Sequence, residues 1–336
     1  MKRTFKNILV IATLLIAVPV LAQNDKSDKA DKAEKKERQR YEFFHERNIS
    51  KTYAASGSTL NIDGQFGMVK VVTWDKNEIK VDIHIEASST NKDLADKTFA
   101  KLDVEDKQDG KNIYFKTLVN KGEKKESFTC NNCSNTMSVD YTIQLPANTP
   151  LNIENSFGGV EVPDYNGPVS IKSKYGHLTA GKLSKPGDIK VEYGKAEIKS
   201  IGNIDLDFKY SSINIDNLTG NCQLSMSFCS YSKIGLDNGL TGLTVKDSYS
   251  SVHLDPAPNL NASYTIQTSY GSLIDNTDIG IKRTDTPGKY GPDLNKTCEG
   301  KSVSGNVKID IKSSFGNIMI GKGSKYDMKE KKKVRS

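Results

Sequence analysis

The sequence predicts an all-β protein built as a β-solenoid, a stack of narrow coils of roughly 18 residues each. The first observation is a repeated unit, in which a short alternating strand, an aromatic residue followed by Gly or Ser, and a second alternating strand succeed one another. The second observation is spacing: Phe157, Tyr175 and Tyr193 are 18 residues apart, and Tyr210 follows after 17. A fixed period of this size is typical of repeat proteins whose units bury their apolar faces only against neighbours.

Each unit has the same internal pattern. Further copies are centred on Tyr231, Tyr249 and Tyr270, with an early copy at Phe66 and a late one at Phe315. Six and four positions before the aromatic residue, side chains are almost all apolar, and polar residues separate them, which predicts a half-buried strand. Apolar residues then fall three and five positions after the aromatic residue. This shift of inward parity requires a bend or bulge at the corner.

The period also predicts how the coils stack. At about 3.3 Å per residue, a unit traces a closed path of about 60 Å, which favours a narrow solenoid over a wide barrel. Stacking at about 4.8 Å would place equivalent aromatic side chains in one column. We expect that column to be internal and to contain Tyr175, Tyr193, Tyr210, Tyr231, Tyr249 and Tyr270.

The N-terminus predicts export. Lys2, Arg3 and Lys6 precede an apolar run over residues 8–20, and small residues follow, so residues 1–22 are interpreted as a signal peptide. The mature protein is therefore expected in the periplasm, at the cell surface or in the medium. Without these three basic residues the net charge falls from +7 to about +4, which gives no support for nucleic-acid binding.

Four further segments follow the leader. Residues 23–48 are highly charged and predict a flexible tether, and residues 49–150 predict the first strand unit with a β-rich N-terminal cap. A short helix is expected at 91–102, with a hairpin turn at Asp109-Gly110. The solenoid repeats are assigned to 151–322, and residues 323–336 to a basic disordered tail.

Several motifs resemble a known bacterial family. The early unit reads Leu60-x-Ile62-x-x-x-Phe66-Gly67-x-Val69-x-Val71, and the segment after it reads Trp74-Asp75-Lys76-Asn77-Glu78-x-x-Val81. The other two motifs are a strand that ends at Leu145-Pro146 and the run of Tyr-Gly repeats. The family is that of the putative adhesins with β-strand repeats, a domain of unknown function related to the head domains of autotransporter adhesins. The resemblance covers roughly residues 44–322.

This resemblance implies a β-solenoid envelope protein with an adhesive role and no catalytic residues to transfer. The sequence departs from the family pattern where Ser replaces Gly after Tyr210, Tyr231 and Tyr249. Its Cys-containing loops also differ, so the resemblance does not identify a ligand.

The cysteines leave several pairings open. Cys130 and Cys133 form a CxxC motif, which a structural disulfide or two unpaired thiols in a loop explain better than a redox pair or half of a zinc site. Cys222 and Cys229 occupy positions that can both point inward, as a bridge across a coil or as two buried thiols. Cys298 leaves an odd count.

No residue pattern indicates catalysis, a cofactor or a metal. The histidines His45, His84, His177 and His253 are scattered singly, and His84 and His177 are expected on the surface. We find no Ser/His/Asp set, P-loop, HExxH or EF-hand pattern. The preferred function is therefore a non-enzymatic, adhesin-like binding or scaffolding module. The alternative is a β-helical polysaccharide lyase or hydrolase, which clustered carboxylates on neighbouring coils would favour.

An outward row three residues before each aromatic residue is the remaining candidate surface. It should stack Glu154, Lys172, Lys190 and Asp207, and later Lys246, Gln267 and Lys312. It is either a shallow anion-binding face or a solvated row that discourages aggregation. Envelope or surface polysaccharide, or another envelope protein, would be the partner.

Overall fold

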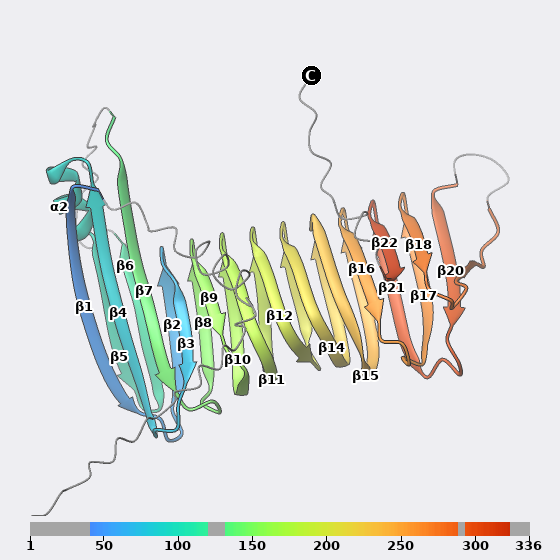
Figure 1. Cartoon of the computed structure of the whole chain (residues 1–336), viewed down its shortest axis with the longest axis horizontal. Coiled ribbons are helices and arrows are strands. Elements are labelled where there is room, and N and C mark those ends of the chain that lie inside the picture. Colours follow the sequence, from blue (N-terminus) through green and yellow to red (C-terminus); the bar gives the residue numbers. More distant parts are fainter. Residues whose placement is uncertain (1–40, 120–131, 288–292, 323–336) are drawn as a thin grey trace, which may run out of the picture. The chain divides into compact units, whose positions relative to one another are not determined.

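The computed structural model describes residues 41–119, 132–287 and 293–322. Within these ranges the protein is almost entirely β-structure with one helix, as the sequence predicts (Figure 1). The segments interpreted as signal peptide and basic tail, most of the tether, and Cys130 lie outside the described residues. No helix in the described ranges is long and apolar enough to cross a membrane.

The N-terminal part combines antiparallel strands with the helix. Its elements are β1 (Phe43–Ala54), β4 (Glu78–Ser89), α2 (Lys92–Ala100), β5 (Leu102–Asp109), β6 (Asn112–Val119) and β7 (Asn135–Leu145). β1 pairs with β4 and β4 with β7, while β5 and β6 form the expected hairpin, with Gly110 at φ +58° in its turn. Asn91 caps α2 by accepting a hydrogen bond from the Leu94 N–H at 3.0 Å.

β1 begins inside the segment interpreted as a tether. Its residues 43–48 pair with β4, and alternate side chains such as Phe43 and Ile49 are half-buried on the side that faces α2. The high charge of this segment hides the strand, because the polar residues between these side chains occupy its solvent face.

The repeat region consists of strands paired in parallel. Their bounds are β2 (Thr59–Gln65), β3 (Val69–Thr73), β8 (Leu151–Ser156), β9 (Gly159–Val162), β10 (Tyr165–Lys174), β11 (His177–Glu192), β12 (Lys195–Gly202), β13 (Asp205–Lys209), β14 (Ser212–Ser227), β15 (Tyr231–Ser248), β16 (Ser251–Pro256), β17 (Ala262–Ser269), β18 (Ser272–Asn276), β21 (Val307–Ser314) and β22 (Asn317–Gly321). Short β19 (Lys282–Arg283) and β20 (Asn295–Lys301) pair with each other, and β20 pairs antiparallel with β17.

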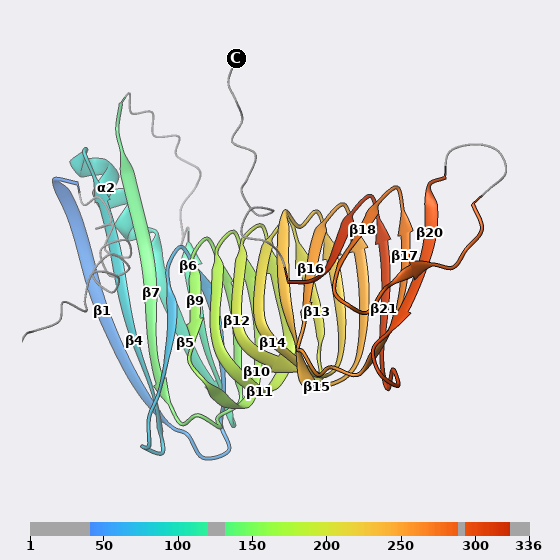
Figure 2. The same ribbon diagram turned by 45° about the vertical axis from the view of Figure 1, so that its right-hand side comes forward.

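Successive units form two parallel ladders. In the first, Ile153 pairs with Ile171, Ile171 with Ile189, and Ile189 with Leu206. In the second, Val160 pairs with Leu178 and continues in the same register. Figures 1 and 2 show these strands side by side along the repeat region. The register matches the sequence period, since equivalent residues of consecutive units are hydrogen-bonded neighbours.

The last unit in the sequence is not the last in space. β21 pairs with β15 on one side and with β17 on the other, and β22 lies in the same way between β16 and β18. The chain therefore passes the position that β21 and β22 fill, forms β17 to β20, and returns to insert its final strands. Sequence spacing alone places Phe315 after Tyr270. In the structure, Phe315 lies between Tyr249 and Tyr270.

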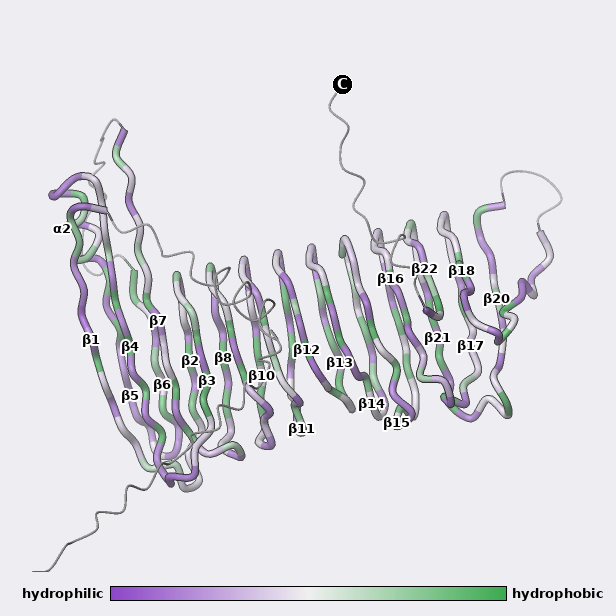
Figure 3. The backbone as a smooth tube through the Cα atoms, viewed as in Figure 1, coloured by the Kyte–Doolittle hydropathy of each residue, from purple (hydrophilic) through white to green (hydrophobic). Residues whose placement is uncertain are grey.

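The core is a column of aliphatic side chains inside the ladders. The residues four positions before each aromatic residue, for example Ile171, Ile189 and Leu206, are 0–2% exposed. Figure 3 shows the resulting alternation of hydrophobic and hydrophilic positions along the strands. The predicted inward register of these aliphatic residues is confirmed.

Asp247 is an exception in this interior. It is 4% exposed, and one of its carboxylate oxygens accepts a hydrogen bond from Ser313 Oγ at 2.7 Å. The other oxygen, Oδ1, has no hydrogen-bond partner within the described residues. Burial raises the pKa of this carboxyl group above its ordinary value, because the interior disfavours the charged form.

The core register can be tested by truncation. Ile189→Ala should lower the free energy of unfolding by about 2–5 kcal/mol, because it removes a fully buried side chain and leaves a cavity. The control is Lys190→Ala, whose side chain is 44% exposed and should change stability by less than about 0.5 kcal/mol. Chemical denaturation measures both, and equal effects would refute the register.

The buried carboxyl group should leave a pH signature. Folded Asp247 keeps its proton to higher pH than unfolded Asp247, so its contribution to the free energy of unfolding falls as the pH rises above 3.8. Asp247→Asn removes this loss. The melting temperature of the variant relative to wild type should therefore increase between pH 4 and pH 7. A difference that stays constant over this interval would contradict the raised pKa.

Candidate functional site: an outer aromatic column and the hollow beside it

The aromatic residues at the corners form one continuous stack. Neighbouring ring centroids are 4.6–5.1 Å apart and the ring planes differ by only 2–9°. We call this stack the aromatic column, and its members in spatial order are Phe66, Phe157, Tyr175, Tyr193, Tyr210, Phe228, Tyr249, Phe315 and Tyr270.

The column lies on the outside of the fold. Tyr175, Tyr193 and Tyr210 are 47–51% exposed, and Tyr270 at one end is 57% exposed. The expectation of an internal column is therefore wrong, although the expected spacing is confirmed. Tyr231 is not a member: Phe228 occupies that position, and Tyr231 begins the following strand, opposite Ser212.

Backbone conformation explains the outward direction. Every member of the column has φ between +50° and +61°, the left-handed region that residues with a Cβ rarely adopt. One such residue between two strands reverses the inward parity and turns its own side chain to solvent. The strain is of order 1–3 kcal/mol per residue. Ring stacking offsets part of it, at about 0.5–1.5 kcal/mol per pair.

The residue after the aromatic lies against the equivalent residue of the neighbouring unit. A Cβ atom added to Gly158 or Gly176 would lie 1.8 Å from the carbonyl oxygen of the equivalent Gly in that unit. These positions therefore require glycine. Where Ser replaces it, the side chain bridges coils instead: Ser211 Oγ accepts from the Gly194 N–H at 3.2 Å and donates to the Lys209 carbonyl oxygen at 2.7 Å.

The stacking decides which part of the column can contact a ligand. Because each ring covers the face of the next, solvent reaches mainly ring edges and the tyrosine hydroxyl groups. A sugar cannot lie flat on an internal ring, but it can lie along the edges. Tyrosine hydroxyl groups both donate and accept hydrogen bonds.

A hollow adjoins the column on its second-ladder side. Its volume is about 460 Å³, within the range of about 300–1,000 Å³ that is usual for small-molecule sites. Ser251 pairs with Asn317 and Asn317 with Ser272, so its floor crosses the three adjacent strands β16, β22 and β18. We call this site the outer hollow, and it is lined by Tyr231, Ser251, Val252, His253, Ser272, Ile274, Asn276, Asn317, Ile318 and Met319.

The outer hollow combines hydroxyl and amide side chains with a larger apolar surface, and His253 is the one acidic or basic residue in its lining. That histidine is 6% exposed, and its Nε2 lies 2.6 Å from the Gly321 carbonyl oxygen. Nε2 therefore carries a proton, which it donates to this carbonyl oxygen. The surface offers hydroxyl and amide groups beside an apolar Ile274, which is 45% exposed. Such a lining suits a neutral, hydroxyl-rich ligand.

The other side of the column is a row of serines at the same coils. Ser227 pairs with Ser248, Ser248 with Ser314, and Ser314 with Ser269. Together with the outer hollow, this row gives the C-terminal half of the column polar, uncharged flanks. The sequence contains this signal, because Ser248, Ser269 and Ser314 each immediately precede a corner aromatic residue that the period identified.

The predicted lysine row exists but is largely paired at its N-terminal end. Lys172 forms an ion pair with Glu154, and Lys190 lies 3.8 Å from Asp188. Lys246 and Lys312 are neighbours on β15 and β21, with Ser225 and Gln267 beside them. The row is therefore of mixed charge, and its two pairs of adjacent lysines are Lys172 with Lys190 and Lys246 with Lys312.

The cysteines and histidines do not gather into one site. Cys133 is disulfide-bonded, and Cys222, Cys229 and Cys298 are free. A bridge between Cys222 and Cys229 is therefore excluded, and burial raises the pKa of both thiols. His177 is exposed on β11 and His84 is half-buried on β4, whereas His45 lies 2.5 Å from Asp96 of α2.

Comparison with solved structures finds proteins described as putative adhesins. A putative cell adhesion protein from Clostridium sporogenes is 13% identical with a TM-score of 0.24, covering 83% of this chain and 100% of that one. A putative adhesin from Bacteroides fragilis is 11% identical with a TM-score of 0.30 (82% and 97% covered). One from Parabacteroides merdae is 8% identical with a TM-score of 0.33 (84% and 98% covered).

No protein-family model and no curated protein matches the sequence. The structural similarities have low identities and low TM-scores, so they carry no argument about a ligand or an activity.

The strained corner makes a specific prediction at Tyr193. Tyr193→Ala removes two stacking contacts and should lower the free energy of unfolding by about 1–3 kcal/mol. Tyr193→Gly removes the same ring but also relieves the left-handed strain, so it should be about 1 kcal/mol more stable than the alanine variant. Denaturant titration of both variants checks this order, and a less stable glycine variant would contradict it.

Proposed function

We propose that this chain is a non-enzymatic, exported β-solenoid of the cell envelope or surface, which acts as an adhesin-like binding module. The parallel ladders with an offset of one sequence period support the solenoid. The predicted signal peptide supports export, and the resemblance of the repeats to the adhesin family supports the class of function. The proposed partner is a surface polysaccharide.

The observation that carries this proposal is the outer hollow beside the exposed aromatic column. Both are built from equivalent residues on successive coils, so the polar groups recur at the spacing of strands, about 4.8 Å. A polysaccharide is likewise long and repetitive, and it offers many hydroxyl groups and apolar C–H faces. Each contact would be weak, and affinity would come from several coils acting together.

The uncharged lining favours a neutral glycan segment. Ser272 Oγ donates to Asn317 Oδ1 at 2.6 Å, so the Ser272 oxygen can accept from sugar hydroxyl groups and the Asn317 amide N–H groups can donate to them. Ser251 can do both, while Tyr231 and Ile274 supply apolar walls. An acidic glycan would instead seek the basic stretch at Lys246 and Lys312. Lys172, which is paired with Glu154, contributes little net charge to such a surface.

A polysaccharide-degrading enzyme is the alternative, and it would require carboxyl groups near the bound sugar. The buried Asp247 has a raised pKa, but it points into the core and is held by Ser313. The outer hollow itself is lined by no carboxyl group among the described residues. Turnover of a bound glycan is therefore measured together with binding.

The binding test uses the chain without residues 1–22 and purified neutral and acidic surface polysaccharides, with affinity measured by biolayer interferometry. The double variant Ser272→Ala/Asn317→Ala should weaken binding of the neutral glycan at least tenfold, because it removes hydrogen-bonding groups from the floor of the outer hollow. Binding should change little between low and high salt, since no ion pair is involved.

The matched control is Tyr114→Ala, which removes an exposed aromatic side chain of β6 away from the column. It should bind as wild type does. Two results would assign binding to the lysine row instead. One is loss of binding at high salt, and the other is loss of binding in Lys246→Glu/Lys312→Glu but not in Ser272→Ala/Asn317→Ala. Release of shorter glycans would show that the protein is a polysaccharide-degrading enzyme and would contradict the proposed binding module.

A further inference from the structure

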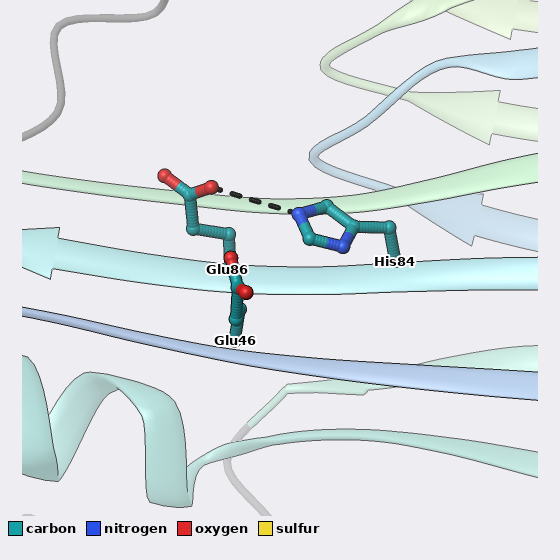
Figure 4. A group of neighbouring side chains, drawn as sticks. All are labelled: Glu46, His84 and Glu86. Carbon is teal, nitrogen blue, oxygen red and sulfur yellow. Dashed lines mark ion pairs between the residues drawn. The ribbon is translucent and has the colours of Figure 1, made fainter.

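Three potential metal ligands meet on the outer face of the N-terminal strands. The ligand atoms of Glu46, His84 and Glu86 all lie within 4.8 Å of one another (Figure 4). Glu46 belongs to β1, and the other two residues belong to β4. This cluster is separate from the aromatic column and the outer hollow. No sequence motif indicates it, because His84 and Glu46 are 38 positions apart.

Strand geometry places these side chains together. Ile83 and Ile85 are buried on the inner face of β4, so His84 and Glu86 both point outward. β1 runs antiparallel to β4, and its register sets Glu46 directly opposite Glu86 and Asn48 opposite His84. The three side chains therefore extend from two hydrogen-bonded strands, and packing of the inner face of β4 fixes the positions of their backbones.

Asn48 sets the chemical state of the histidine. His84 Nδ1 lies 2.8 Å from Asn48 Oδ1, and an amide oxygen can only accept a hydrogen bond. Nδ1 therefore carries the proton, and Nε2 presents its lone pair. This is the arrangement in which a histidine binds a metal through one nitrogen while a neighbouring oxygen orients the other.

The distance between His84 and Glu86 also fits shared coordination. Nε2 is 3.6 Å from Glu86 Oε2, which is too long for a good hydrogen bond. Two ligands of a tetrahedral zinc ion, each bound at about 2.0–2.1 Å, lie about 3.3 Å apart.

From these observations we propose that Glu46, His84 and Glu86 bind a divalent transition-metal ion of the zinc type. A nitrogen ligand with two carboxylates suits Zn²⁺, Cu²⁺ or Ni²⁺ better than Ca²⁺ or Mg²⁺, which take oxygen ligands in larger number. Three protein ligands leave a coordination position that water or a donor atom of a partner can fill. Asn48 is a positioning residue in this site.

The test is titration of the metal-free chain, lacking residues 1–22, with Zn²⁺ by isothermal calorimetry, repeated with Co²⁺ by visible absorption. One ion should bind per chain, and an excess of Mg²⁺ should not compete. His84→Ala and Glu86→Gln should each weaken binding at least tenfold. The exposed His177 provides the matched control, and His177→Ala should leave the affinity unchanged.

Two further variants separate positioning from ligation. Asn48→Ala should weaken Zn²⁺ binding about tenfold, whereas Asn48→Asp, which still accepts the Nδ1 proton, should restore it. Melting temperatures in EDTA show whether each variant is folded. Absence of Zn²⁺ binding by the wild type would overturn the proposal. Binding that survives His84→Ala and is lost in Cys298→Ser would also overturn it, because the metal would then be bound by the Cys298 thiol.

Discussion

The close approach of neighbouring corners is the constraint on which the rest of the repeat region depends. At Gly158 and Gly176 the backbones of successive units approach so closely that a Cβ atom would meet the carbonyl oxygen of the neighbouring glycine. Ser211, at the same position of a later unit, accepts a hydrogen bond from the Gly194 N–H of its neighbour. The aromatic residue that precedes this position is in the left-handed conformation in every member of the column, and this conformation turns each ring outward.

This arrangement separates stability from recognition. The aliphatic residues, such as Ile171 and Ile189, fill the interior, and the rings stack outside it. The faces of the rings are used in holding successive coils together, while their edges and hydroxyl groups remain available. The side chains beside them can therefore vary, from the ion pair of Lys172 with Glu154 to the serines and asparagine of the C-terminal coils, without disturbing the core.

Sequence reasoning predicted the features that follow from period and alternation. The strands, the inward aliphatic residues, the helix capped by Asn91 and the hairpin at Gly110 all follow from local patterns. It failed where the outcome depends on a backbone angle or on distant pairing. An aromatic residue in an alternating pattern is ordinarily assigned to the core, and the sequence does not indicate that Tyr193 has a φ of +55°.

The same limit applies to the candidate sites. Phe228 holds the place in the column that the period assigned to Tyr231, because Tyr231 follows it by three residues and begins the next strand. The pairing of Glu46 with Glu86 depends on the register between β1 and β4, which alternation alone leaves open. By contrast, the lysine row could be predicted, because its residues occupy equivalent positions of the repeat and the repeat length alone aligns them.

The insertion of β21 and β22 between earlier strands has a consequence for how the protein is made. A repeat array can usually fold from one end to the other as its units are synthesised or exported. Here the coil that contains Tyr270 cannot find its neighbour until the last segment of the chain has arrived. This end of the protein must wait for a distant segment, which raises contact order and slows its completion. A chain truncated before residue 307 would lack β21 and β22 and would leave a gap in the stack, so this part of the fold is completed only after residues 307–321 have been made.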